Sequence, residues 1–142
     1  MNQPGSFATT SARASEQPGH ADIQSLPVPE SWKHKFLLIA KAGGPKLPNL
    51  KALSFGERFK ISFNILGFLL GPLYYLAKGM WKKALSYFGA GLLFLVLAGA
   101  ALDLVGQGKV ADALGYGLAA LFGVRANIDY YKKMVLGENG WW

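Results

Sequence analysis

The chain has 142 residues, a length that supports one domain, and apolar residues make up 51% of it while charged residues make up 16%. Fifteen basic side chains against 8 acidic ones give a formal net charge of +7. The absence of cysteine excludes disulfides, thiolate metal sites and thiol catalysis. With 2 histidines and no nucleophile–base or paired-carboxylate pattern, we expect no enzymatic activity, no cofactor and no metal.

Residues 1–31 are mainly Ser, Ala, Thr, Gln, Gly and Pro, a composition that predicts a disordered N-terminal tail. A secretory signal fits poorly because no apolar run follows Arg13. Residues 32–142 are predicted to form one small helical membrane domain. In its first segment, 32–42, lysines alternate with aromatic and aliphatic residues over a length that suits an interfacial helix or strand.

A helix is predicted to begin after Ser54. Ser54 and Glu57 have the capping-box spacing, in which each side chain accepts a hydrogen bond from a backbone N–H of the other. Apolar residues then recur at spacings of three and four along an amphipathic stripe, at Phe55, Phe59, Phe63 and Leu66. This helix opens a segment of about 54–80 that we interpret as a re-entrant or interfacial helical hairpin.

Gly71 and Pro72 interrupt the uncharged stretch 61–77 near its middle, where a helix most readily breaks. The part before the break, 61–70, covers about 15 Å, roughly half a bilayer, so the stretch is predicted to enter the membrane and return. The alternative is a continuous spanning helix with a proline kink, which membrane helices tolerate.

Two transmembrane helices are predicted next, at about 84–102 and 110–126. The first has no charged residue and covers about 28 Å, close to the hydrocarbon thickness of a bilayer. The uncharged part of the second is short enough to be a buried helix of a soluble protein. Small residues that favour close packing of membrane helices recur along one of its faces, at Ala111, Gly115, Ala119 and Gly123.

The distribution of basic residues separates two topologies. If the 61–77 stretch crosses as well, equal numbers of Lys and Arg fall on the two sides and no orientation is preferred. If it re-enters, the basic residues near the membrane segments fall on one side and Lys109 alone falls on the other. The sequence therefore favours two spans, with both termini in the cytoplasm.

Three stretches resemble one known family. They are FNILGFLLGPLYYLAKGMWKK at 63–83, KAGGPKLPNLKALSFGER at 41–58 and RANIDYYKK at 125–133. Over about 32–135 the chain is similar to the domain-of-unknown-function 2628 family of small bacterial inner-membrane proteins. The resemblance implies a bacterial inner-membrane setting and supplies neither an activity nor catalytic residues.

Candidate site residues fall into two sets. Aromatic and basic residues that anchor the chain at the lipid interface, or bind anionic headgroups or a partner, are Tyr74, Tyr75, Lys78, Trp81, Lys82, Lys83, Tyr130, Tyr131, Lys132 and Lys133. Candidates for helix packing are Asn64, Gly71, Pro72, Gly115, Ala119 and Gly123. Asp103 and Asp112 are interpreted as a solvated loop and an N-cap rather than a cation site.

These features predict an all-α, multi-pass protein of the bacterial inner membrane that acts by binding. Its expected partners are membrane lipids and another membrane protein or a second copy, with no nucleic acid. An adaptor, an assembly factor or an immunity-type protector would use the small-residue face and the aromatic-basic hairpin. The alternatives are a subunit of an oligomeric transporter or channel, with Asn64 contacting substrate, and a soluble basic domain.

Overall fold

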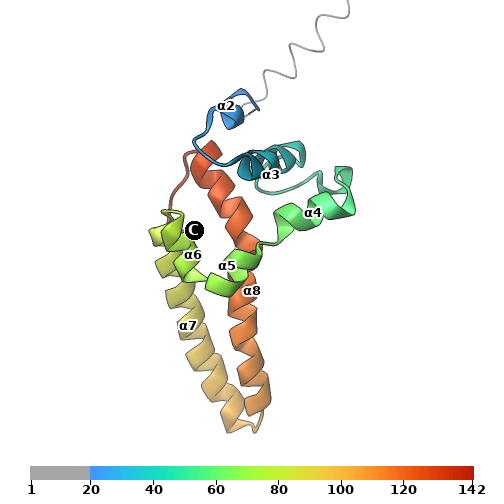
Figure 1. Ribbon diagram of the computed structural model, residues 1–142. Coiled ribbons are helices and arrows are strands. Elements are labelled where there is room, and N and C mark those ends of the chain that lie inside the picture. The colour runs from blue at the N-terminus through green and yellow to red at the C-terminus, as the bar shows by residue number, and fades with distance from the viewer. Residues whose placement is uncertain (1–19) are drawn as a thin grey trace, which may run out of the picture.

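The computed structural model describes residues 20–142, and its regular elements there are all helices, with no strand, which confirms the all-α class for this part of the chain (Figure 1). Residues 1–19 of the predicted tail lie outside the described residues. The helices are α2 (His20–Ser25), α3 (Glu30–Lys41), the 3-10 helix η1 (Leu50–Ala52), α4 (Phe55–Ser62), α5 (Ile65–Leu70), α6 (Pro72–Ala77), α7 (Trp81–Leu104) and α8 (Gly108–Val135).

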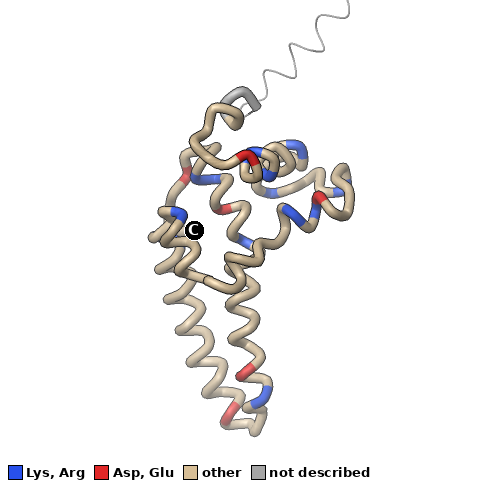
Figure 2. Tube along the Cα trace, viewed as in Figure 1, with Lys and Arg blue, Asp and Glu red and all other residues tan. Residues whose placement is uncertain are grey.

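Helices α7 and α8 run side by side in opposite directions and form a two-helix shaft (Figure 1). Helices α3 and α4 and the C-terminal half of α8 form a head, and α5 and α6 lie where the head meets the shaft. Charged residues gather in the head and beside the turn between α7 and α8, and the shaft between them has none (Figure 2). The fold thus separates an apolar shaft from a basic head.

Part of the segment predicted as a disordered tail is folded. Helix α2 packs on α3, Ile23 is fully buried and Val28 is 9% exposed. A few apolar side chains within a polar stretch are enough to dock it when a neighbouring helix offers an apolar face. Residues 23–31 therefore differ from the predicted disordered tail.

The segment predicted as an interfacial helix or strand is helix α3, and it packs against α8. Its buried side chains Trp32, Phe36 and Ile39 recur at spacings of three and four. The Trp32 ring lies 4.7 Å from that of Tyr130, and the Phe36 ring lies 5.8 Å from that of Tyr131. The apolar face of α3 is therefore used inside the protein.

The predicted capping box is confirmed at the start of α4. The Ser54 N–H donates to the Glu57 carboxylate at 2.8 Å, and the Glu57 N–H donates to Ser54 Oγ at 3.4 Å. The backbone hydrogen bond from Ser54 holds the pKa of Glu57 below its usual value. The helix ends at Ser62, before the predicted apolar stripe is complete, because Phe63 and Asn64 are extended.

The helix break expected at Gly71–Pro72 is present. Gly71 has φ 51° and ψ −122°, a conformation that favours glycine, and Pro72 opens α6. The two ends of 61–77 are held close together on α8, since Asn127 donates to the Ile61 carbonyl and Lys133 to the Lys78 carbonyl. Asn127 and Lys133 lie about 9 Å apart along the helix, far less than a bilayer's thickness.

Among residues 20–142, α7 is the one helix long and apolar enough to cross a membrane. Only 6% of its most apolar window is buried, whereas the core helix of a soluble protein would be mostly covered. Helix α8 carries Lys109 and Asp112 near its start and does not meet the same criterion. The second span and the multi-pass topology therefore stay predictions.

Candidate functional site

A buried amide network joins the α5–α6 hairpin to α8. The Asn64 amide nitrogen donates to Tyr74 Oη and to Asn127 Oδ1, both at 3.0 Å, and Asn64 Oδ1 accepts from the Gly67 N–H at 2.9 Å. Asn127 Nδ2 faces the carbonyls of Lys60, Ile61 and Phe63 at 3.0–3.2 Å. Both amides are thus used to fix the entry of the chain into the hairpin.

Two residues further along α8, the carboxylate of Asp129 is completely buried and anchors a second network. Its Oδ2 accepts from Tyr75 Oη at 2.9 Å, and its Oδ1 lies 3.5 Å from Arg125 Nη2 and 4.0 Å from Lys83 Nζ. Arg125 Nη2 also donates to Tyr87 Oη at 3.0 Å. Since Lys83 is 1% exposed, the carboxylate stabilises an ammonium ion that water does not reach.

Aromatic rings of α3 and α8 surround Lys78, the residue that follows the α5–α6 hairpin. Lys78 Nζ lies 5.0 Å from the Trp32 ring centroid and 4.9 Å from that of Tyr130, distances typical of cation–π contacts. Burial lowers the pKa of Lys78, and the charge of Lys133 lowers it further. Lys35 Nζ lies 4.6 Å from the same Trp32 ring, and its pKa is lowered by burial and by Lys78.

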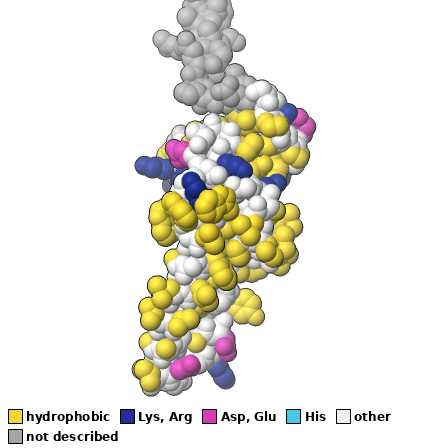
Figure 3. Space-filling view, turned by 90° about the vertical axis from the view of Figure 1, so that its left-hand side faces the viewer, with side chains coloured by type: hydrophobic (Ala, Val, Ile, Leu, Met, Phe, Trp, Pro, Cys, Tyr) yellow, Lys and Arg dark blue, Asp and Glu magenta, His cyan; other side chains and the backbone are white. Residues whose placement is uncertain are grey.

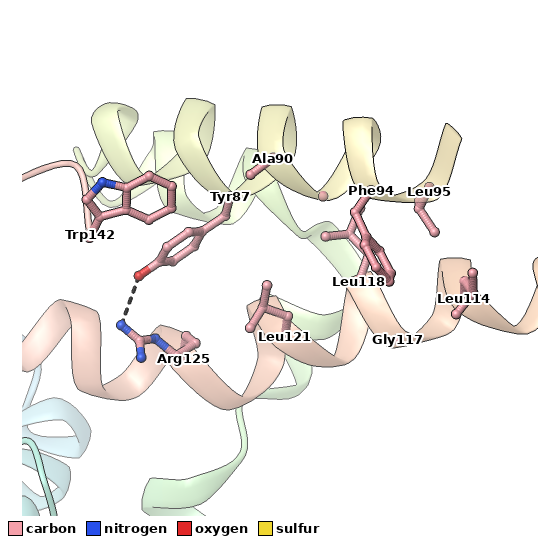
Figure 4. A pocket seen from close by; sticks show the side chains of 11 residues that line it. Tyr87, Ala90, Phe94, Leu95, Leu114, Gly117, Leu118, Leu121, Arg125 and Trp142 are labelled. Carbon is pink, nitrogen blue, oxygen red and sulfur yellow. Dashed lines mark hydrogen bonds between the residues drawn. The ribbon is translucent and has the colours of Figure 1, made fainter. Parts of the chain in front are cut away.

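A groove of about 720 Å³ lies between α7 and α8 (Figure 4). Its apolar walls are formed by Ala90, Gly91, Phe94 and Leu95 of α7 and Leu114, Gly117, Leu118 and Leu121 of α8. Tyr87, Arg125 and Trp142 form the one polar end, where the Arg125–Tyr87 hydrogen bond lies (Figure 4). The groove therefore accommodates an apolar body with one polar group at the head end.

Two glycines set the width of this groove. At Gly91 the helices are in close contact, because an added Cβ would lie against the side chain of Leu118. At Gly117 an added Cβ would meet nothing within 4 Å. A larger side chain at Gly117 would thus enter the groove without disturbing the contact between the helices.

The predicted interface residues divide into buried and accessible ones. Tyr74, Tyr75, Lys83, Tyr130 and Tyr131 are buried within the protein. Trp81 is 48% exposed, and its ring packs edge-on against that of Trp141. Lys78, Lys82, Lys132 and Lys133 are half-buried. The tyrosines therefore stabilise the fold from its interior, whereas Trp81 and the half-buried lysines remain accessible at the surface.

The predicted helix-packing residues also divide. An added Cβ at Gly123 would lie 2.9 Å from both Phe63 and Phe68, so the hairpin already covers this glycine. Gly115 is exposed with open space around it, and Ala119 is half-buried. Gly71 is buried beside Phe122, and Pro72 is half-buried. The small-residue face is thus occupied at its Gly123 end and open at its Gly115 end.

Seven residues of the site are not among the candidate site residues predicted from the sequence, namely Trp32, Lys35, Tyr87, Arg125, Asn127, Asp129 and Trp142. One signal was available, because Arg125 and Asp129 are four residues apart on one helix and so share a face. Within the described residues, no group of three His, Cys, Asp or Glu side chains is placed to hold a metal ion.

Comparison with known proteins identifies the family. The sequence pattern of the family described as "Protein of unknown function (DUF2628)" matches residues 13–135, which extends the predicted resemblance toward the N-terminus. The uncharacterized protein YigF of Escherichia coli K12 is 30% identical over 120 residues, which cover 79% of this chain and 89% of YigF. YigF of Salmonella typhimurium LT2 is 29% identical with the same coverage. No solved structure matches significantly. The chain therefore belongs to the DUF2628 family of proteins of unknown function.

Proposed function

We propose that the chain is a small integral protein of the bacterial inner membrane that binds a transmembrane helix of another membrane protein. The observation that carries this proposal is the groove between α7 and α8, which is apolar along its walls and polar at one end. The partner helix would lie along the apolar walls, with a carboxylate or a free carbonyl at its cytoplasmic end facing Arg125.

The exposed surface supports a membrane location. Large apolar side chains of the shaft and hairpin face outward, including Leu69 and Leu73 of the hairpin at 68% and 64% exposure and Leu93 and Leu97 of α7 at 61% and 63%. In Figure 3 hydrophobic side chains cover the shaft and the hairpin, whereas basic ones lie above them and at the far tip. A surface of this kind in water would favour aggregation, whereas lipid covers it without cost.

The hairpin supports the two-span topology over the three-span one. Because both ends of 61–77 are held by the same part of α8, the stretch lies at one level of the protein. The basic residues of the head then lie on one side of the bilayer and Lys109 on the other. The bias in Lys and Arg favours the orientation with the head and both termini in the cytoplasm.

Cysteine labelling tests this topology, since the chain has no native cysteine. We expect a membrane-impermeant thiol reagent to label Gln107→Cys in intact cells and to leave Ala52→Cys and Glu138→Cys unlabelled until the membrane is opened. All three positions are exposed on the protein, so protection reports the membrane and not burial. Labelling at Ala52 or Glu138 in intact cells would contradict the proposed orientation.

The proposed partner helix has a polar group at one end that complements Arg125. Arg125 keeps 40% of its side chain exposed, and its Nε lacks a hydrogen-bond partner within the described part of the chain. Gly117 brings no side chain into the groove and has open space beside it, so a second backbone can approach closely there. The combination favours a transmembrane helix that carries an acidic or carbonyl group at the level of Arg125.

Filling the groove is expected to abolish partner binding. A photo-crosslinking side chain at Leu121, which lines the groove, should give a discrete adduct in cells, and one at Phe88, which is exposed outside it, should not. Gly117→Leu should lower the adduct at least tenfold because its side chain occupies the groove. Gly115→Leu is the matched control, because it also points into open space but does not line the groove.

Two outcomes would contradict the groove as the partner site. Equal adducts from Leu121 and Phe88 would show random collisions in the membrane. An adduct with the mass of two copies of this 15.3 kDa chain would assign the groove to self-association.

No observation favours transport as a second function. The transport alternative used Asn64 as a contact for substrate. Asn64 is 5% exposed, and its amide oxygen and nitrogen are both hydrogen-bonded to neighbours in the fold.

A further inference from the structure

A second pocket of about 430 Å³ lies between α3, α4 and the α5–α6 hairpin. Its basic side chains come from three separate segments, with Lys35 on α3, Lys60 on α4 and Lys78 immediately after α6. We call these three residues and the space between them the lysine pocket. The fold therefore lines one pocket with three lysine residues that are distant in sequence.

The charges of the lysine pocket are not neutralised within the described protein. The ion pairs among the described side chains join Glu30 to Lys33 and Asp129 to Lys83 and Arg125, and none involves the lysine pocket. Lys35 and Lys78 instead share one aromatic ring, that of Trp32, at 4.6 and 5.0 Å from its centroid. Like charges held this close repel each other, so an anion between them would be stabilised.

One edge of the lysine pocket is apolar and open. Phe59, Ile65 and Leu66 line it, and each keeps more than half of its side chain exposed, at 57%, 59% and 56%. These residues continue into the outward-facing leucines of the hairpin. The pocket thus lies at the border between the basic head and the apolar surface, which is the level of lipid phosphates in the proposed topology.

We propose that the lysine pocket binds one anionic phospholipid, with its phosphate among Lys35, Lys60 and Lys78 and its acyl chains along Ile65, Leu66 and Phe59. A free phosphate would satisfy the lysines but leave the apolar edge uncovered, whereas a lipid covers both. Because three lysines line one pocket, we expect a single bound lipid, in contrast to the diffuse attraction of a basic protein to an anionic membrane surface. The inference rests on the membrane location in the proposed function and is independent of the α7–α8 groove.

Lipid titration of the full chain in detergent tests the pocket, with bound lipid counted by native mass spectrometry. We expect phosphatidylglycerol to bind the natural chain saturably and tighter than phosphatidylcholine. The double variant Lys35→Gln/Lys78→Gln should weaken phosphatidylglycerol binding about twenty-five-fold, at about fivefold for each cation near a lipid headgroup. Lys46→Gln/Lys51→Gln is the charge-matched control, and we expect its affinity to match that of the natural chain.

A milder variant keeps the test informative if the double variant does not fold. Lys60 is exposed, so Lys60→Gln leaves the packing intact and is expected to weaken binding about fivefold. Equal losses in the pocket variants and the control would overturn the proposal in favour of diffuse attraction. Displacement of the lipid by millimolar inorganic phosphate would also overturn it and assign the pocket to free phosphate.

Membrane sedimentation separates failure of this proposal from failure of the proposed function. A chain that sediments with membranes but binds phosphatidylglycerol and phosphatidylcholine equally refutes the lipid site alone. A chain that stays in the supernatant refutes the membrane location on which both proposals depend.

Discussion

Replacing Asp129 by Asn is expected to lower the free energy of unfolding by about 3–5 kcal/mol, the usual cost of removing one partner from a buried ion pair. Asp129 is fully buried, and its carboxylate is the negative charge beside Lys83 Nζ and Arg125 Nη2. Lys83 is itself 1% exposed and has no access to water that would replace the lost partner. The change should appear as a shift of the denaturation midpoint of the purified protein in detergent, followed by circular dichroism.

A matched control is available at the far end of the shaft. Asp112 is exposed, so Asp112→Asn is expected to change the free energy of unfolding by less than about 0.5 kcal/mol. Adding Lys83→Met to Asp129→Asn should recover part of the loss, because the buried ammonium is then removed with its partner. A loss of less than about 1 kcal/mol in Asp129→Asn would mean that water reaches this cluster and that it does not secure the hairpin.

Local signals in the sequence predicted the parts of the fold that depend on neighbouring residues. The capping box at Ser54 and Glu57 and the break at Gly71 and Pro72 are each set within a few residues, and both are present. The long uncharged stretch 84–102 likewise lies within α7 because its composition alone makes it a helix of that length. These features require no knowledge of what packs against them.

The site was less predictable because it depends on which segments cover one another. The aromatic and basic residues after Arg125 have the composition of a membrane-interface tail, yet α8 continues to Val135 there. Tyr130 and Tyr131 are buried because α3, which begins 100 residues before Tyr130, packs over them. Composition is the same for an exposed and a covered tyrosine, so sequence alone does not separate the two.

The groove and the lysine pocket illustrate the same limit. A groove between two helices depends on their separation at each level, which Gly91 narrows and Gly117 leaves open. Both glycines have the same expected effect on helix packing when judged from the sequence. Lys35 and Lys78 belong to segments with separate interpretations, and their approach across Trp32 follows from the docking of the hairpin beside α3.

Gly123→Leu is expected to release the α5–α6 hairpin from α8 and to lower the free energy of unfolding by about 3 kcal/mol. An added Cβ at Gly123 would lie 2.9 Å from the Phe63 ring, 2.9 Å from Phe68 Cβ and 3.3 Å from the Asn64 carbonyl oxygen. Two of these contacts are too short for carbon atoms, so the hairpin would have to move. The Gly123 carbonyl also accepts from the Asn64 N–H at 2.8 Å, a buried hydrogen bond that the movement would break.

Hydrogen exchange measures this release directly. We expect the backbone amides of 65–77 to exchange at least tenfold faster in Gly123→Leu than in the natural chain. Gly115→Leu adds the same side chain to the same helix in open space, so it should leave that exchange unchanged. The comparison also decides how a binding experiment with Gly123 is to be interpreted. If the hairpin is released, loss of a partner in Gly123→Leu reports damage to the fold. If exchange is unchanged, the hairpin does not cover Gly123, and the whole small-residue face is free to pack against another helix.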